Sequence, residues 1–466
     1  MRPFDRMSAW WVRTAPVDPA MAAALRRRWR ELPDVVRTEN QLVGRHAVGC
    51  EGTHGVFPRC NLTCKPCYHS ADANKVRVDG PHTVDQVEAQ MAWLQAHRAP
   101  HGHAQLIGGE VTLLDPDDHA AALLAMRAHG REPMSMTHGD VDADYLRRLV
   151  LDDEGEVRLP RVSFAAHMDS LMRGRRGIPR PRDERALEPY RRRFLELVRG
   201  LRRDHGVRSY VAHNMTVTPA NVGQVAEVVR TTVPMGYDML SFQPAAYVGD
   251  ERRWVEDFRS IDPDAVWAEI ERGAGGPLPW RALQMGDPRC NRSAWGWLVA
   301  DRFVPLLDED DPRDLAFRDQ VLRRAGGVRV SGTPPLVLLV RLARVAVGNL
   351  GALPAAVGWV RRSVRRSGGA LHLLRHARSV RPMTFVMHMF MDAAQVRPAW
   401  ELMERNEVAT DPEVRATQER LRSCVYAMAH PEQGRVVPAC VQHSVLDPAE
   451  NRGLRRLLPL VEVRSG

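Results

Sequence analysis

Three cysteines within eight residues constrain this chain more than any other feature. Cys60, Cys64 and Cys67 lie in the segment CNLTCKPCYH, at the spacing C-x3-C-x2-C. The chain has seven cysteines, an odd number, and such crowding fits reduced thiols and metal ligation better than a disulfide framework. The segment directly follows a predicted strand, so its thiols are expected at the carboxyl end of that strand. The spacing therefore predicts a metal centre.

The kind of metal centre follows from the number of thiols. Three thiolates from one tight loop can hold a [4Fe–4S] cluster and leave its fourth iron without a protein ligand. S-adenosylmethionine can bind that iron through its amino and carboxylate groups and accept an electron at its sulfonium. Structural zinc prefers four protein ligands, typically two C-x2-C pairs, and no second pair is present. A redox dithiol of Cys64 and Cys67 would leave Cys60 unexplained.

Residues 45–250 alternate short apolar runs with amphipathic helical stretches, a pattern typical of β/α units around a parallel sheet. Helices are predicted at Val84–Ala96 and Leu187–Asp204. We predict an α/β fold, a partial (β/α)6 barrel with a C-terminal α+β extension. The predicted strands are His46–Gly49, Ala104–Ile107, Pro133–Thr137, Arg161–Ala165, Tyr210–Thr216 and Met239–Gln243. The predicted units are an N-terminal extension (1–44), the barrel (45–270), a connecting helical region (271–379) and a C-terminal domain (380–466).

The segment QLIGGEVTLL supplies a second motif about forty residues after the cysteine loop. Gly108 and Gly109 end a predicted strand and let backbone approach a ligand, and Glu110 can accept a hydrogen bond from the methionine ammonium. Together with the cysteine loop, this strand end resembles the radical S-adenosylmethionine superfamily. The resemblance implies a radical SAM barrel and reductive cleavage of S-adenosylmethionine to a 5′-deoxyadenosyl radical, which abstracts hydrogen from a substrate.

The ends of later strands supply further candidates for contacts with cofactor or substrate. The superfamily places ribose contacts near the third strand end, which is SMTHGD here. Its usual aromatic residue before the third cysteine is replaced by Pro66, with Tyr68 just after the motif. Each candidate can equally cap a turn. The candidates are Thr137, Gly139, His167, Asp169, Asn214, Thr216, Asn221 and Gln243.

The C-terminal part carries a narrower resemblance. Its segments HMFMDAAQV and LRSCVYAMAHPEQGRVVPACVQHSV look like the branch that contains tetraether lipid synthase and the folate- or methanopterin-linked radical methylases. Asp392, Cys424 and Cys440 match the tail pattern, although Ala439 replaces the branch's aromatic residue. The resemblance implies C–C bond formation or methylation at an unactivated carbon of an apolar substrate, with lipids among the substrates.

Four cysteines remain outside the first motif. Cys424 and Cys440 flank a predicted hairpin, and together with Cys290 they can ligate a second iron–sulfur cluster, with Cys50 as a fourth candidate ligand. Lone cysteines more often serve as small buried apolar residues, so both interpretations remain open. His388, four residues before Asp392, is expected to share a helix face with it, most simply as a core histidine.

Residues 334–366 are apolar with interspersed arginines, and no charge occurs from Val345 to Val360. Gly348, Gly351 and Pro354 interrupt a run that is too short to span a bilayer. Two interpretations remain open. One is an amphipathic segment at a membrane surface, with the arginines of residues 361–366 on acidic lipid. The other is a pair of core helices whose arginines are solvated.

Composition limits the kinds of partner that the chain is expected to bind. The net charge is +9 but aromatic residues make up only 6%, which argues against a dedicated nucleic-acid binder while favouring anionic partners. Charged residues interrupt every apolar run near the N-terminus, so we expect a cytoplasmic enzyme, membrane-associated if residues 334–366 contact lipid. A reducing partner such as ferredoxin or flavodoxin is expected. The alternatives are tailoring of a peptide or small natural product, and a non-enzymatic zinc or electron-transfer protein.

Overall fold

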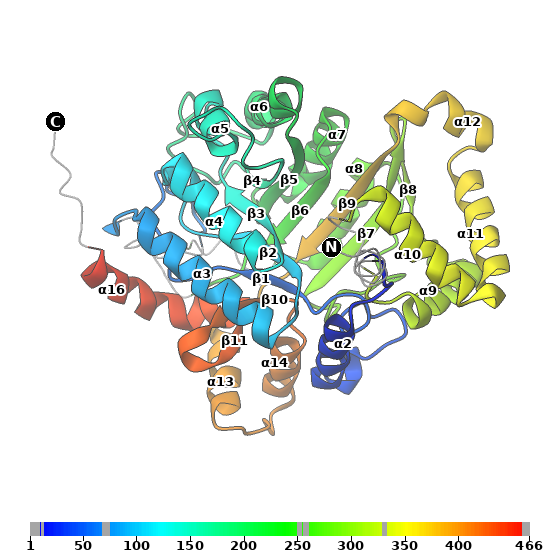
Figure 1. Cartoon of the computed structure of the whole chain (residues 1–466). Helices are drawn as coiled ribbons and strands as arrows, with labels where there is room; N and C mark the ends of the chain where they lie inside the picture. The colour runs from blue at the N-terminus through cyan, green and yellow to red at the C-terminus, as the bar shows by residue number, and fades with distance from the viewer. Residues whose placement is uncertain are drawn as a thin grey trace, which may run out of the picture.

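The computed structural model describes residue 10 and residues 14–67, 75–248, 254, 261–328 and 333–458. Within these ranges one eleven-stranded sheet forms, in the spatial order β11-β10-β1-β2-β3-β4-β5-β6-β9-β7-β8 (Figure 1). Its strands are β1 (Cys50–Gly52), β2 (Gly102–Leu106), β3 (Arg131–Thr137), β4 (Arg161–His167), β5 (Arg208–Val217), β6 (Met239–Pro244), β7 (Asn291–Val299), β8 (Arg302–Pro305), β9 (Arg381–His388), β10 (Tyr426–His430) and β11 (Arg435–Pro438).

A parallel run forms the body of this sheet. It extends from β10 through β1 to β6 and on to β9. Strands β1 to β6 are consecutive in sequence and in space, and a helix connects each to the next, as right-handed β/α units require. The predicted α/β class is confirmed, and five of the six predicted strands overlap β2 to β6.

The first predicted strand is displaced. Residue 46 ends a turn and residues 47–49 form no strand. The amides of His46 and Ala47 both donate to the carbonyl oxygen of Leu42. Gly49 follows with a φ of 133°, a conformation that interrupts an extended strand. For these two reasons β1 begins only at Cys50.

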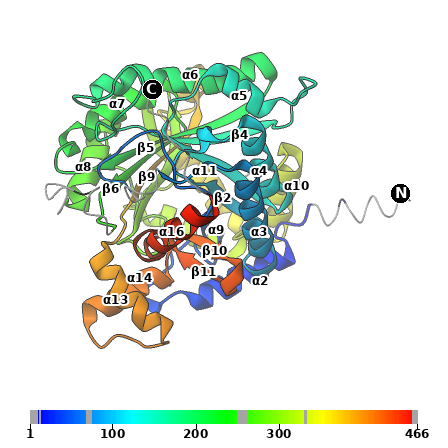
Figure 2. The same ribbon diagram turned by 90° about the vertical axis from the view of Figure 1, so that its left-hand side faces the viewer.

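Helices occupy the outer face of the parallel sheet, as the two views at right angles show (Figure 2). Side chains of Asp79, Asp115 and Asp142 cap the first three connecting helices. The predicted helices at 84–96 and 187–204 correspond to α3 and α6. The connecting helices are α3 (Gly80–His97), α4 (Pro116–Ala128), α5 (Ala143–Val150), α6 (Glu188–His205), α7 (Val225–Met235) and α8 (Pro263–Ala274).

The remaining helices precede or follow this set. They are α2 (Pro19–Glu31), α9 (Pro312–Arg324), α10 (Pro335–Val347), α11 (Leu353–Arg366), α12 (Ala370–Arg375), α13 (Ala393–Glu404), α14 (Pro412–Arg422), α15 (Ala439–Val441), the π-helix η11 (Gln442–Leu446) and α16 (Asp447–Leu457).

The main apolar core lies between the sheet and its outer helices. Met91 and Leu94 of α3 are fully buried there with Phe164 of β4, Val211 of β5 and Leu240 of β6. The buried face of α3, which carries Val87, Met91 and Leu94, therefore packs on the sheet. This packing fixes the strand ends from which the loops around the site begin.

The sheet curves around a cavity at the carboxyl ends of its parallel strands. A flat sheet would separate β10 from β6 by roughly 29 Å, since neighbouring strands lie about 4.8 Å apart. Tyr426 of β10 and Gln243 of β6 nevertheless line the same cavity. Within the described chain the two end strands, β11 and β8, do not pair with each other, so the sheet stays open.

The C-terminal half contributes more to the sheet than its pattern indicated. Residues 271–379 were expected to be a helical connection, but they contain the antiparallel pair β7–β8, and β7 pairs with β9. The predicted hairpin between Cys424 and Cys440 is confirmed as β10–β11, and β10 inserts beside β1. The predicted boundaries near 270 and 380 thus fall between elements of one sheet, and the division into units stays a prediction.

His388 and Asp392 do not share a helix face, contrary to expectation. His388 ends β9, and Asp392 is the residue before α13, so they lie on two elements joined by a short irregular segment. The imidazole of His388 lies 2.5 Å from Oδ1 of Asn291, and burial lowers its pKa to about 4. It is the satisfied core histidine that the simpler interpretation predicted.

The apolar segment 334–366 forms two helices, α10 and α11, which are bent by 96° at the glycine-containing break between them. Among the described residues no single helix has the length and apolar character needed to cross a membrane, although this bent pair meets those criteria jointly. Figure 1 shows α10, α11 and α12 at one side of the molecule, away from the strand ends that form the cavity.

Candidate cofactor and active site

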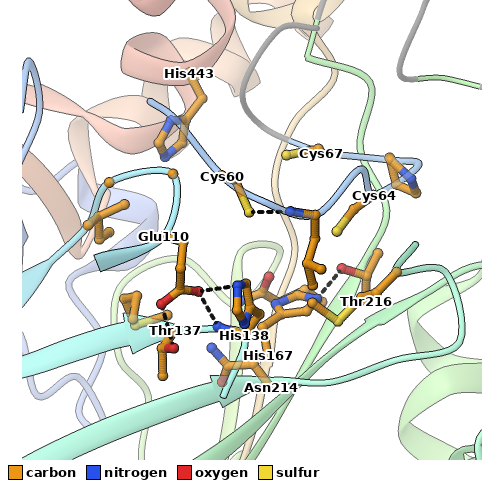
Figure 3. A pocket seen from close by; sticks show the side chains of 18 of the residues that line it. Cys60, Cys64, Cys67, Glu110, Thr137, His138, His167, Asn214, Thr216 and His443 are labelled. Carbon is orange, nitrogen blue, oxygen red and sulfur yellow. Dashed lines mark hydrogen bonds and ion pairs between the residues drawn. The ribbon is translucent and has the colours of Figure 1, made fainter. Parts of the chain in front are cut away.

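The three motif cysteines line one cavity at the mouth of the parallel sheet (Figure 3). Cys60, Cys64 and Cys67 are half-buried, and no disulfide joins them. The buried side chain of Leu62 anchors their loop, and its backbone amide donates to Sγ of Cys60 at 3.3 Å. The cavity has a volume of about 190 Å³. That space is far larger than a water molecule needs.

The glycines of the second motif support the cysteine loop. The amide of Gly109 donates to the carbonyl oxygen of Phe57, and that of Glu110 donates to Arg59, both at 2.9 Å. A Cβ atom on Gly109 would overlap the carbonyl oxygen of Arg59. We expected these glycines to admit a ligand. In the structure Gly109 instead lies against the backbone that leads into the cysteine loop. Both glycines also line the cavity.

Glu110 is almost fully buried, and its carboxylate is surrounded by donors. Oε1 accepts from the amide and hydroxyl of Thr112 and, at 2.6 Å, from the hydroxyl of Thr137. Oε2 accepts from the amide of His138 at 2.7 Å and lies 3.2 Å from Nε2 of the same residue. In this structure the carboxylate therefore joins β2 to β3. Its predicted contact with a methionine ammonium stays a prediction.

His138 extends this connection to the cysteine loop. Its Nε2 lies 2.7 Å from Oδ1 of Asn61, and its Nδ1 accepts from the amide of Asp140. Burial lowers the pKa of His138, which favours a neutral ring with its proton on Nε2. Since Asn61 follows Cys60 directly, β3 and the cysteine loop are held in a fixed relation.

Five of the later strand-end candidates reach the cavity. Thr137, His167, Asn214 and Thr216 line it, whereas Asn221 is buried beside it and bonds to the backbone of Thr216 and Thr218. The hydroxyl of Thr137 is occupied by Glu110. The side-chain amide of Asn214 makes no hydrogen bond to any described residue, which leaves it available to a bound molecule. Gln243 of β6 also lines the cavity.

His167 and Asp169 form a pair at the end of β4. Nε2 of His167 lies 2.7 Å from Oδ2 of Asp169 and 3.1 Å from the hydroxyl of Thr216. Asp169 also accepts from the amides of Leu171 and Thr216 at 2.9 and 3.0 Å. The carboxylate thus holds β4 and β5 together while the His167 ring faces the cavity.

The C-terminal part closes the cavity with residues that the sequence did not identify. Phe390, Tyr426 and His443 line it, and His443 points toward it from the π-helix η11 (Figure 3). Nδ1 of His443 lies 2.8 Å from Oδ2 of Asp447. The one sequence signal was the spacing of this histidine and aspartate by four residues, close after Cys440. Such spacing is common and carries little information by itself.

The second group of cysteines, Cys290, Cys424 and Cys440, interacts electrostatically. Negative charge on Cys424 and Cys290 contributes to raising the pKa of Cys440, after burial as the main cause. Burial, with a smaller contribution from Cys424, raises the pKa of Cys290 to about 11, and Nε of Arg420 donates to its sulfur at 3.2 Å.

Cys50 is placed differently from these three. It lies on β1, where its thiol faces the carbonyl oxygen of His103 at 3.5 Å. Burial raises its pKa to about 12, and Glu51 and Arg98 are the charged groups that act on it. Nothing in this arrangement supports its predicted role as a fourth cluster ligand.

Comparison with known proteins gives little guidance. No protein-family model matches the chain, and no curated protein sequence does. Similar solved structures include Streptococcus suis SuiB, at 13% identity over 48% of this chain and 44% of that chain, with a TM-score of 0.30. Another is anSMEcpe with bound AdoMet and Cp18Cys peptide, at 15% identity over 47% and 57% of the two chains, with a TM-score of 0.31.

This chain thus spans about half the length of the structures that it matches. TM-scores near 0.3 carry no argument about superfamily or activity. In its cysteine spacing, its GGE strand end and the parallel α/β sheet that brings both to one cavity, the chain resembles the radical S-adenosylmethionine superfamily.

Proposed function

We propose that this chain is a radical S-adenosylmethionine enzyme that acts on an apolar substrate. The observation that carries the proposal is the position of the three motif thiols. They open into the same cavity as Gly108, Gly109 and the carboxyl ends of β3 to β6. In parallel α/β folds ligands bind at this end of the strands.

The donor set fits a [4Fe–4S] cluster. Cys60, Cys64 and Cys67 supply three thiol ligands from one short loop, and the amide of Leu62 is already directed at the sulfur of Cys60. Hydrogen bonds of this kind to cysteine sulfur tune the reduction potential of a cluster. Structural zinc sites are closed by four ligands, whereas these thiols face a cavity with room for a further molecule.

When bound, a reduced cluster of this type supplies the electron that converts S-adenosylmethionine into methionine and a 5′-deoxyadenosyl radical. The chain's own residues position and shield the reactants. Asn214 offers an unoccupied amide at the end of β5. Glu110 and His138 hold the strand ends and the cysteine loop in place.

The lining of the cavity supports an apolar substrate. Leu62, Ile107, Met136, Met172 and Phe390 contribute apolar walls. Such walls exclude water, which would otherwise react with or hydrate the reacting groups. We infer hydrogen abstraction from an unactivated carbon, followed by C–C bond formation or methylation. Tailoring of a peptide or small natural product is the competing reaction class. Turnover of such a soluble substrate would identify it.

Cys290, Cys424 and Cys440 support a second proposal, an additional iron–sulfur cluster. The proposal is supported by the contribution of Cys424 and Cys290 to the raised pKa of Cys440, and of Cys424 to that of Cys290. Arg420 beside Cys290 would partly neutralise the charge of thiolate ligands. A small electron carrier such as ferredoxin or flavodoxin is the proposed source of electrons, in a cytoplasmic setting.

The test is anaerobic reconstitution of the full chain, with iron and sulfide counted and 5′-deoxyadenosine assayed after reduction by dithionite. The Cys60→Ala/Cys64→Ala/Cys67→Ala variant should lose about four irons and all 5′-deoxyadenosine. Cys50→Ala is the matched control and should lose neither.

The Cys290→Ala/Cys424→Ala/Cys440→Ala variant examines the second cluster in the same assay. A fall from about eight irons to about four supports it, and an unchanged iron count rejects it. Zinc without iron, and no 5′-deoxyadenosine from wild type, would reject the enzyme itself in favour of a zinc protein.

A further inference from the structure

A long part of the chain contains no acidic residue. From Gln320 to Met391 there is no aspartate or glutamate, although these make up 57 of the 466 residues, and the same stretch has twelve arginines. This stretch contains the helices α10, α11 and α12. We call these three helices the basic arm. Segregation of charge on this scale indicates an anionic partner.

Helix α11 turns two of its arginines toward the protein, which an ordinary surface helix would turn toward water. Arg362 Nε and Arg366 Nη1 each lie 2.6 Å from the carboxylate of buried Asp314. Ser363 is buried on the same face. The indole of Trp359 donates to the carbonyl oxygen of Leu306 at 2.9 Å. These contacts fix which face of the helix points outward.

The outward face of α11 is apolar. Leu353, Val357 and Val360 follow one another at helical spacing and are 41%, 49% and 49% exposed. Arg361 and Arg365 are exposed beside them and form no ion pair with any described residue. An amphipathic helix normally buries its apolar face, so this helix presents to its surroundings the face that would favour an apolar phase.

The two neighbouring helices of the basic arm show the same exposure. Of the eighteen large apolar side chains that are exposed in the described residues, eleven lie between Leu336 and Val380, which makes the patch local rather than random scatter. On α10 they are Leu336, Leu339, Leu342 and Val347, and on α12 they are Leu371 and Leu374.

We propose that the outer face of the basic arm binds the surface of a bilayer that contains anionic phospholipid. Exposed leucines and valines next to unpaired arginines match an apolar interior beneath acidic headgroups. A second copy of the chain would set one acid-free arm against another, where the arginines would repel. Nucleic acid would pair with the arginines but leave the leucines in water. The inner contacts with Asp314 hold α11 along the protein, as a helix lying in the interface requires.

Vesicle flotation tests this with anaerobically reconstituted full chain. Wild type should float with vesicles containing about 30% phosphatidylglycerol, and much less with phosphatidylcholine alone or at high salt. Leu339→Ser/Val357→Ser/Val360→Ser and Arg361→Gln/Arg365→Gln should each lower the partition coefficient about tenfold. All five side chains are exposed, so thermal melting should be unchanged.

Matched controls separate the basic arm from general surface effects. Val35→Ser/Val157→Ser/Val408→Ser removes three exposed valines elsewhere, and Arg192→Gln/Arg193→Gln removes two exposed arginines on α6. Both should float like wild type.

Four results would overturn the proposal. Three are no flotation of wild type, equal loss in arm and control variants, and a dimer in solution that the arm variants dissociate. The fourth is salt-sensitive binding of RNA without flotation. None of these readouts depends on the proposed radical chemistry.

Discussion

Two buried carboxylates fasten the strand ends that surround the cavity. Glu110 connects β2 to β3, and Asp169 connects β4 to β5 through His167 and two backbone amides. A buried charge is tolerated only where donors replace its water, and both carboxylates meet this condition. At the scale of single residues, the rigidity of the site therefore depends on groups that need not touch a cofactor.

The pH dependence of stability should reveal the contribution of Asp169. Burial by itself raises the pKa of this carboxyl, but the charge and hydrogen bond of His167 and two amide donors bring it below its usual value. Its stabilisation is therefore present above about pH 4 and is lost as the pH falls through the folded-state pKa. Asp169→Asn should lower the free energy of unfolding at pH 7 by about 1–3 kcal/mol.

Urea denaturation between about pH 2.5 and pH 7 measures this effect. Below about pH 4 the free energy of unfolding should change less with pH in Asp169→Asn than in wild type. Asp153→Asn, at an exposed position, should follow wild type. Parallel curves for wild type and Asp169→Asn would show that the carboxylate adds nothing to the fold.

At the scale of elements, the cysteine loop is shaped by its neighbours as much as by its own sequence. The amides of Gly109 and Glu110 hold the loop through two backbone hydrogen bonds, and Asn61 connects it to β3 through His138. A short loop with no regular structure is thereby fixed from two sides. Cluster assembly should depend on these contacts.

Gly109→Ala tests the support from β2. The added methyl group would overlap the carbonyl oxygen of Arg59, so the cysteine loop should shift while the core remains folded. Iron per chain after reconstitution should fall several-fold, with an unchanged far-UV circular dichroism spectrum. Gly223→Ala, where a Cβ meets no atom within 4 Å, is the control. Full iron loading in Gly109→Ala would mean that the contact is dispensable.

Sequence reasoning succeeded where the signal was local. Strands β2 to β6, the helices α3 and α6 and the pairing of the cysteine loop with the GGE strand end follow from periodicity and spacing. It failed where partners are distant in the chain. Long-range packing determines the donors around Glu110, the insertion of β10 beside β1 and the closure of the cavity by His443. Hydrophobic periodicity reports only local structure and does not predict such contacts.

At the scale of the whole molecule, the sheet joins the two ends of the chain. β10 lies between β1 and β11, and β9 lies between β6 and β7, so residues after 380 supply interior strands. Their side chains are part of the main core, where Phe385 and Met387 are fully buried. We therefore predict that the C-terminal residues fold together with the rest of the sheet and not as a separate attachment to it.

Truncation checks this prediction. A chain that ends at residue 379 would leave β1 and β6 as unpaired edges and expose part of the core, so it should show no cooperative thermal transition. A chain that ends at Leu458 keeps every described element and should melt like the full protein. A cooperative transition in the shorter chain would establish the predicted boundary near 380 as a true domain boundary.

The place of β10 also sets an order of events during synthesis. The cysteine loop follows β1, which is made early, but β1 gains its second neighbour only when residues 426–430 leave the ribosome. His54, just before the loop, likewise waits for its contacts with Ala429 and Glu450. Because Tyr426 and His443 line the cavity, it is incomplete until these residues have been made. Binding of the proposed cluster is therefore expected only after their synthesis.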